Sequence, residues 1–288
     1  MKFYADSKLP TNVKISKVIT FAYLGTELVL VKNKLKDWNL ITCKVTNNND
    51  WIADIKNEAA ITAGIQIDNI EVVGYFEFDD SIAPVTISFV KNVDYDWSSD
   101  NTTREKFREL EVLPILKNML DSNELLNAYT HVLAQLKNCE IEFAMQKGNE
   151  FEDFITTQVM LFCRNKENMY CIVRDYDEDF YSLPGGGCNL GENEIDAARR
   201  ELLEEAQIEL INPVKIATIG VTLKKNGQIV NRIKHVRYLS EAHNIKEFEP
   251  RKDNFETVDR IFVYKNELKS KVWLLQNPSG DALIELLN

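Results

Sequence analysis

Residues 183–208 read LPGGGCNLGENEIDAARRELLEEAQI, and they combine a glycine cluster, a helix start and many carboxylates. Pro184 interrupts a strand, and the three glycines after it allow the backbone to turn sharply and to expose its carbonyls. Asn193 suits the N-cap of a helix, and Asp196 in the first turn suits the positive end of the helix dipole. The stretch therefore predicts a tight turn followed at once by a helix.

The predicted helix has two unlike faces. Its apolar stripe, which would face a core, has the spacing i, i+3, i+7 and consists of Ile195, Ala198 and Leu202. Its other face brings three carboxylates within one helical turn, namely Glu201, Glu204 and Glu205. An isolated run of glutamates is usually a solvated surface, because like charges at i, i+4 cost only about 0.2–0.5 kcal/mol. Beside a glycine turn, however, carboxylates and a backbone carbonyl form the oxygen ligand set that Mg²⁺ or Mn²⁺ prefers.

The spacing of these residues resembles the Nudix box, the signature of the Nudix hydrolases, G-x5-E-x7-R-E-U-x-E-E-x-G-U, in which U is apolar. Eight of its nine defined positions match over residues 186–208. The departure is Gln207, where the family has a glycine that ends the helix. A non-glycine residue in the left-handed conformation of such a helix end costs about 1 kcal/mol. We expect this cost to fall on stability and not on the chemistry.

The resemblance implies a hydrolase that uses Mg²⁺ or Mn²⁺ and water to cleave a diphosphate linkage. The substrate class is a nucleoside diphosphate linked to another moiety X, a small molecule. By matching position, the metal ligands would be Glu201, Glu204, Glu205 and the carbonyl of Gly185. Arg200 would hold a box carboxylate through its i, i+4 pairing with Glu204. Gly186 and Glu192 would brace the turn.

The resemblance also implies a further catalytic carboxylate in the loop before the final strand. Glu256 is our choice, and Glu247 and Glu249 are weaker candidates. The general base would be one of the box glutamates or this loop residue. The expected catalytic set is therefore Arg200, Glu201, Glu204, Glu205 and Glu256.

Composition restricts the class of protein. A chain of 288 residues is long enough for two domains, and its formal net charge of −11 argues against tracking a nucleic-acid backbone. We expect no membrane span and no signal peptide, because no apolar run is long enough. The cysteines, an odd set without a CxxC pair, indicate reduced thiols in a cytoplasm. They are Cys43, Cys139, Cys163, Cys171 and Cys188.

The first half of the chain repeats the pattern of the second. Residues 38–65 align with the box without a gap at a constant offset of 143. Glu58 falls under Glu201 and Gly64 under Gln207, but Ile61 and Thr62 replace the other two glutamates. One carboxylate does not hold a divalent ion against water. The alignment predicts a tandem duplication with a degenerate first copy.

The predicted fold class is α/β (α+β): two tandem Nudix-like α/β/α sandwich domains with mixed sheets. Residues 1–140 would be the degenerate, non-catalytic domain, and residues 141–288 the hydrolase domain. The expected strands are 17–21, 27–32, 70–78, 85–93, 157–163, 169–174, 214–223, 228–238 and 260–264. One or two helices are expected over 114–136 and a short helix over 282–287. Asn226-Gly227 is a strong hairpin signal.

Two further interpretations stay open. The densest basic run, which lies on that hairpin, could meet phosphates but is expected to be solvated: Lys224, Lys225, Arg232, Lys234 and Arg237. As an alternative to an enzyme, the chain could be a non-catalytic nucleotide-binding sensor or scaffold, since one half has lost its carboxylates. The first domain could serve as a homodimer surface or a platform that shapes the substrate site.

Overall fold

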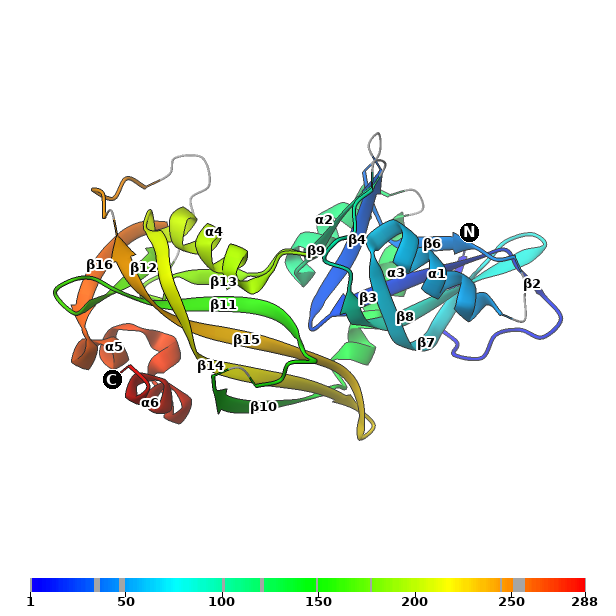
Figure 1. Cartoon of the computed structure of the whole chain (residues 1–288). Coiled ribbons are helices and arrows are strands. Elements are labelled where there is room, and N and C mark those ends of the chain that lie inside the picture. The colour runs from blue at the N-terminus through cyan, green and yellow to red at the C-terminus, as the bar shows by residue number, and fades with distance from the viewer. Residues whose placement is uncertain are drawn as a thin grey trace. The chain divides into compact units, whose positions relative to one another are not determined.

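The computed structural model describes residues 2–33, 37–46, 50–99, 102–119, 122–148, 150–176, 178–243, 245–250 and 257–287 (Figure 1). Its contacts divide the chain into two compact units. Unit 1 comprises Met1–Glu142, Asn189–Gly191 and Thr222–Ile233. Unit 2 comprises Phe143–Cys188, Glu192–Val221 and Lys234–Asn288.

Unit 1 is built on a mixed sheet. Its strands are β1 (Lys2–Tyr4), β2 (Lys14–Ile15), β3 (Lys17–Leu24), β4 (Glu27–Asn33), β5 (Trp38–Asn39), β6 (Ile41–Lys44), β7 (Ile65–Glu77), β8 (Ser81–Val93) and β9 (Thr102–Phe107). The order in the sheet is β1-β7-β8-β3-β4-β5, with β6 paired to β3 and β9 paired to β4. β3 runs parallel to β8 and antiparallel to β4. The helices are α1 (Trp51–Ala63), α2 (Glu109–Lys117) and α3 (Ser122–Leu136).

Unit 2 repeats this plan. The second sheet lies mostly in unit 2, and only the start of β10 and the β14–β15 hairpin (Thr222–Ile233) are counted with unit 1. Its strands are β10 (Glu140–Lys147), β11 (Ile155–Arg164), β12 (Met169–Asp175), β13 (Gly185–Gly187), β14 (Glu209–Lys225), β15 (Gln228–His243) and β16 (Thr257–Tyr264). Their order is β10-β14-β15-β11-β12-β16, with β13 paired to β11. The helices are α4 (Glu194–Ala206), α5 (Lys265–Lys271) and α6 (Pro278–Glu285), and Trp273–Leu275 forms a 3₁₀ turn. The predicted fold class, α+β with mixed sheets, is confirmed.

Two apolar cores cover the two faces of the sheet of unit 2, as expected from alternation along a strand. Val159 and Leu161 of β11 face α4 and pack with its buried residues. Phe162, the next residue, faces the opposite side and packs with Leu268 of α5 and Leu283 of α6. Figure 1 shows α4 on one face of this sheet and α5 and α6 on the other. This layering is the predicted α/β/α sandwich.

The structure corrects several element predictions. The strand β9, Thr102–Phe107, is not among the expected strands. The strand β10, an edge strand whose residues are mostly exposed, was not predicted, and the predicted division between residues 140 and 141 falls within it. The helix α5 was not predicted. The hairpin at Asn226 and Gly227 is confirmed, since both residues have positive φ, 52° and 75°.

The basic run is also corrected in part. Solvation was expected, but Lys225, Lys234 and Arg237 are buried, with 9%, 7% and 3% of their surface exposed. Charged residues are seldom this buried unless a partner or a ligand compensates them. Separately, no helix in the described part of the chain has the length and apolar character that a membrane crossing requires.

Candidate active site

The glycine turn is fastened to the sheet of unit 2. β13 pairs antiparallel with β11, so that Gly185 lies opposite Met160 and Gly186 opposite Val159. Gly185 has φ +145°, and a Cβ atom there would lie 2.3 Å from the carbonyl oxygen of Val159. Only glycine fits this combination of backbone angle and close approach. The pairing of its backbone with β11 therefore holds the turn in place independently of the carboxylates.

The helix start is the one that the sequence predicts. Asn193 is the N-cap of α4, and its side-chain oxygen accepts from the backbone N–H groups of Ile195 (3.1 Å) and Asp196 (3.0 Å). Ala198 and Leu202 are fully buried in the core between α4 and the sheet. This packing fixes the rotation of α4 about its axis, so the glutamate positions keep a constant relation to the glycine turn.

Two of the predicted metal ligands contact the glycine turn. The carboxylate of Glu205 accepts a hydrogen bond of 2.8 Å from the backbone N–H of Gly185. Glu201 is 8% exposed, and a Cβ atom added to Gly186 would lie 2.6 Å from its Oε1. Burial is the main reason why the pKa of Glu201 is raised, against the lowering effect of Arg200. The carboxylate of Glu201 therefore fits against the turn because residue 186 has no side chain.

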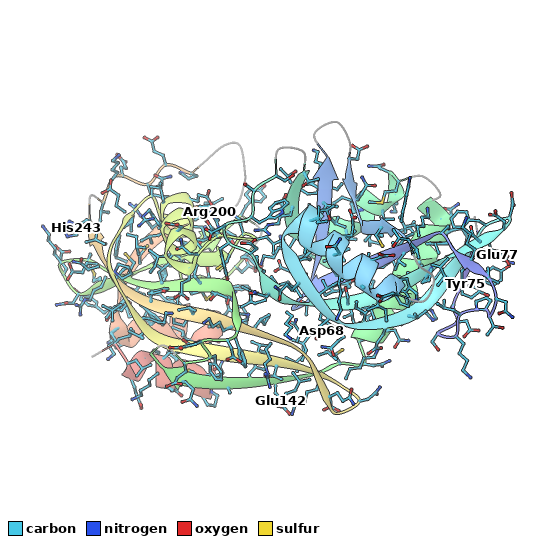
Figure 2. All side chains as sticks on the ribbon, turned by 45° about the vertical axis from the view of Figure 1, so that its right-hand side comes forward. Asp68, Tyr75, Glu77, Glu142, Arg200 and His243 are labelled. Atoms are coloured by element: carbon cyan, nitrogen blue, oxygen red, sulfur yellow. The ribbon has the colours of Figure 1, made fainter. Side chains whose placement is uncertain are left out.

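Arg200, labelled in Figure 2, joins the remaining box residues in one network. Its Nε and Nη2 donate to the carboxylate of Glu192 at 2.9 and 2.8 Å, and Nη2 also donates to the carbonyl of Gly187 at 2.9 Å. Its Nη1 donates to Glu201 at 2.7 Å and to Glu204 at 3.2 Å. The pKa of Arg200 is raised, chiefly by its hydrogen bond with Glu192. The sequence pointed to Glu204 alone, and the structure adds Glu192 and Glu201.

The carboxylates are not arranged as a preformed metal cage. Among the described residues, no group of three or more His, Cys, Asp or Glu side chains has the geometry to hold a metal ion. The donor set nevertheless suits a hard cation, since Glu201 and Glu205 both lie against the glycine turn and supply oxygen atoms. Arg200 engages one oxygen of Glu201 (Oε1) and one oxygen of Glu204 (Oε2).

Gln207, the departure from the box, has the backbone conformation of the glycine that it replaces. Its φ of 54° and ψ of 39° are left-handed. Its side-chain amide also pairs with the backbone of Glu249, donating to the carbonyl at 2.5 Å and accepting from the N–H at 3.2 Å. Arg260 adds to this attachment by donating to the carbonyls of Ala206 (2.6 Å) and Lys246 (2.5 Å). The side chain of Gln207 thus holds the loop at 245–250 against the end of α4.

Of the three glutamates considered as the catalytic carboxylate of the loop, the structure describes two. Glu256 lies outside the described residues. Glu247 and Glu249 are exposed, and the contacts of Glu249 to Gln207 are made by its backbone.

Further charged residues lie near the start of α4, and Lys234 of the basic run is one of them. Glu194 forms an ion pair with Lys215 of β14 and accepts from Thr156 of β11 at 3.3 Å. Lys234 of β15 donates to the carbonyl of Phe151 at 3.0 Å, and burial lowers its pKa. Alternation along β14 and β15 does not predict these contacts, because the residues that Lys215 and Lys234 contact come from distant segments.

Arg237 is the most unusual of these charges. Its guanidinium donates to the side chain of Gln158 at 3.2 Å and to the carbonyl of Val236 at 3.2 Å. Neither of these partners is a carboxylate, and its Nε has no hydrogen-bond partner among the described residues. Burial lowers the pKa of Arg237 to about 10. Gln158 lies opposite Gly187 in the pairing of β11 with β13. The buried guanidinium of Arg237 therefore contacts Gln158, a residue that pairs directly with the glycine turn.

Comparison with known proteins places this site in a family. The model of the NUDIX domain matches residues 155–281, which include the glycine turn and α4. No curated protein sequence matches the chain.

Solved structures also match the chain. A mutant pyrophosphohydrolase from Bacillus subtilis is 18% identical with a TM-score of 0.40, and the match covers 50% of this chain and 89% of that one. A NUDIX hydrolase from Nitrosomonas europaea is 20% identical with a TM-score of 0.35, covering 46% and 87%. A MutT structure from a study of Aliivibrio salmonicida and Vibrio cholerae is 16% identical with a TM-score of 0.30, covering 45% and 93%. Residues 155–281 of this chain, which span the glycine turn and α4, thus match the NUDIX domain.

Proposed function

We propose that unit 2 is a hydrolase, dependent on a divalent metal ion, of the diphosphate linkage in a nucleoside diphosphate joined to another moiety. The observation that carries the proposal is the contact of Glu201 and Glu205 with the glycine turn inside the NUDIX domain.

Glu201, Glu204 and Glu205, with the carbonyl of Gly185, are the residues that would hold Mg²⁺ or Mn²⁺. A metal bound there neutralises phosphate charge and lowers the pKa of a bound water. Arg200 positions two of these carboxylates and ties them to Glu192 and the turn. The general base is one of the glutamates, either in the box or in the loop that contains residue 256.

The buried cations favour an anionic substrate. Arg237 has lost its hydration without gaining a carboxylate, and a phosphate oxygen would supply the missing charge. In this proposal, the metal ions and Arg237 neutralise the charge of the diphosphate, although the net charge of the chain is negative. We infer a small phosphorylated substrate rather than a nucleic acid.

The test is Mg²⁺-dependent turnover of a panel of nucleoside diphosphate derivatives by the wild type, Glu205→Gln and Arg237→Met. Loss of a metal ligand should lower kcat by at least about a hundredfold. Arg237→Met should raise KM more than it lowers kcat, because a contact to an unreacting phosphate oxygen binds ground state and transition state alike. Chelation with EDTA should abolish turnover, and Mg²⁺ or Mn²⁺ should restore it.

A non-catalytic nucleotide sensor is the competing function. One observation favours it: Arg200 already pairs with two of the three carboxylates that a metal needs. It predicts that the wild type binds a nucleotide, as measured by calorimetry, while no member of the panel is turned over with either metal. That result would replace the hydrolase.

A further inference from the structure

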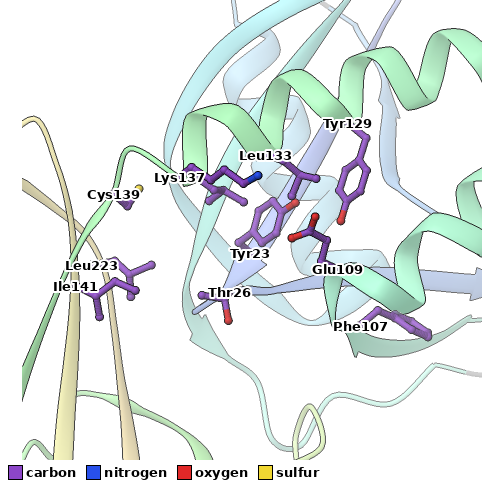
Figure 3. A pocket seen from close by; sticks show the side chains of 11 residues that line it. Tyr23, Thr26, Phe107, Glu109, Tyr129, Leu133, Lys137, Cys139, Ile141 and Leu223 are labelled. Atoms are coloured by element: carbon purple, nitrogen blue, oxygen red, sulfur yellow. The ribbon is translucent and has the colours of Figure 1, made fainter.

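Unit 1 contains a cavity of about 180 Å³ (Figure 3). Its lining includes an acid and a base, Glu109 and Lys137, both exposed, and two buried tyrosines whose hydroxyls interact with each other, Tyr23 and Tyr129. The cavity therefore does not favour one charge of ligand over the other. Unit 2, by contrast, has a loop at 245–250 whose backbone is anchored to the end of α4.

The loop is anchored at two points. The side-chain amide of Gln207 pairs with the backbone of Glu249, donating to the carbonyl at 2.5 Å and accepting from the N–H at 3.2 Å. Arg260 of β16 donates to the carbonyl of Lys246 at 2.5 Å, and its guanidinium lies 5.3 Å from the ring centroid of Phe248. The backbone of the loop is therefore held while the side chain of Glu249 stays exposed.

Gln207 anchors the loop at a cost to the helix end. Its backbone is left-handed, with φ 54° and ψ 39°, and this conformation costs a non-glycine residue about 1 kcal/mol or more. The helix does not require a side chain here, because the matching residue of unit 1 is Gly64, which ends α1 in the same conformation. Backbone strain of this kind clusters at functional sites. The side chain of Gln207 is therefore better explained by the loop that it holds than by α4 itself.

The box carboxylates have other partners. Glu201 and Glu204 accept hydrogen bonds from Arg200 at 2.7 and 3.2 Å, and Glu205 accepts one from the glycine turn at 2.8 Å. In the proposed function these carboxylates also hold the metal ion, so little of their acceptor capacity is left for a proton. The carboxylate of Glu249 has no hydrogen-bond or ion-pair partner among the described residues.

We propose that Glu249 is the general base of the hydrolase and that Gln207 is the residue that positions it, an inference that rests on the proposed function. Glu204 lies one helical turn before Gln207, so the loop is anchored within a turn of a candidate metal ligand. The carboxylate of Glu249 takes a proton from the attacking water, whose oxygen forms a bond to phosphorus. The bond from phosphorus to the bridging oxygen breaks, and the leaving phosphate keeps the electron pair.

The test uses the full chain and the substrate that the panel identifies. Glu249→Gln should lower kcat by about a hundredfold and leave KM within about threefold, as expected for the loss of a general base. The control Glu241→Gln changes an exposed glutamate on β15 and should keep kcat within about twofold. Binding of Mn²⁺, followed by electron paramagnetic resonance, should be unchanged in Glu249→Gln and at least about tenfold weaker in Glu205→Gln, because only the second variant removes a metal ligand.

Variants of the anchor separate positioning from a merely structural role. Gln207→Gly removes the amide, and Gln207→Asn keeps an amide that tolerates the left-handed conformation but is one methylene shorter. Each should lower kcat about tenfold alone and have no further effect when combined with Glu249→Gln, because Gln207 acts through Glu249. Additive losses in the combined variants would show that Gln207 supports the fold and not the base.

The outcomes distinguish failure of this inference from failure of the proposed function. If the wild type hydrolyses the substrate and Glu249→Gln keeps its kcat, Glu249 is not the base, although the hydrolase stands. Weaker Mn²⁺ binding in Glu249→Gln would make Glu249 a metal ligand and would also overturn the inference. If the wild type turns over no member of the panel with either metal, the proposed function and this inference fail together.

Discussion

Helices α1 and α4 share a scaffold and differ in chemistry. Each is 13 residues long, they are offset by 143 residues, and each ends in a left-handed residue: Gly64 with φ 55°, ψ 37° and Gln207 with φ 54°, ψ 39°. An arginine donates to the last helical carbonyl of each, Arg104 to Ala63 at 2.5 Å and Arg260 to Ala206 at 2.6 Å. The two units thus share the details that end the helix as well as the strand order.

The two helices differ at the positions that form the candidate site in unit 2. Asn57, Ile61 and Thr62 stand in α1 where α4 has Arg200, Glu204 and Glu205. Thr62 donates to the carbonyl of Glu58 within its own helix, and Ile61 is 61% exposed. The segment before α1 has Thr42 and Cys43 in place of two glycines, so it cannot repeat the close approach of the turn. We infer that the helix ends preserve the fold, whereas the glycines and glutamates serve only the site.

Gly186→Cys is expected to have the largest effect among the tests of whether fold and site depend on different residues. It places in unit 2 the residue type that unit 1 has at the matching position, Cys43. The new Cβ atom would lie 2.6 Å from Glu201 Oε1 and displace that carboxylate. Activity should fall by about a hundredfold while the free energy of unfolding changes by about 1 kcal/mol or less, since only the end of a flexible side chain moves. The converse variant Cys43→Gly is the control, and its activity per folded molecule should be unchanged. Full activity in Gly186→Cys would mean that the position of Glu201 is unimportant.

The helix ends give the next largest effect. A Cβ atom on Gly64 would lie 2.3 Å from Trp97 Cγ and 2.5 Å from Arg104 Nη1. Gly64→Gln should therefore lower the free energy of unfolding of unit 1 by about 2 kcal/mol or more, from left-handed strain and crowding together. Urea denaturation followed by tryptophan fluorescence measures it. A variant as stable as the wild type would contradict the close packing around Gly64.

Gln207→Gly, the opposite exchange in unit 2, should have the smallest effect on stability. It relieves about 1 kcal/mol of left-handed strain but removes the two hydrogen bonds to Glu249, which offset it. The net change should be within about 1 kcal/mol. Hydrogen exchange should nevertheless become faster in residues 245–250, because the loop loses an anchor. Unchanged exchange there would show that Arg260 alone holds the loop.

Much of the site could be predicted from sequence because it is local. The N-cap at Asn193, the buried stripe with Ala198 and Leu202, and the left-handed Gln207 follow from spacing along one helix. Arg237 could not be predicted in this way. Its residue type suggests solvent, and only the placement of β15 beside β11 buries it next to Gln158. The three hydrogen bonds of Arg260 and Gln207 with the loop at 245–250 are likewise set by tertiary structure.

The strands that were not predicted have a related cause. β9 reads TTREKF and carries too few apolar residues to signal a strand. It forms because β4 offers an unpaired edge, with Arg104 opposite Val31, and Arg260 has the matching place opposite Val173 of β12. Pairing with a distant strand outweighed local composition. The resemblance between the units is therefore clearer in pairing than in sequence.

The most direct test of the account compares Glu201→Gln with Glu58→Gln, since these two glutamates hold the same position in α4 and α1. Mg²⁺-dependent hydrolysis would be measured for both variants and the wild type, with the substrate that the panel identifies. We predict that Glu201→Gln loses at least about a hundredfold in kcat and that Glu58→Gln stays within about twofold of the wild type. Equal losses in the two variants, or full activity in Glu201→Gln, would contradict the assignment of the chemistry to unit 2.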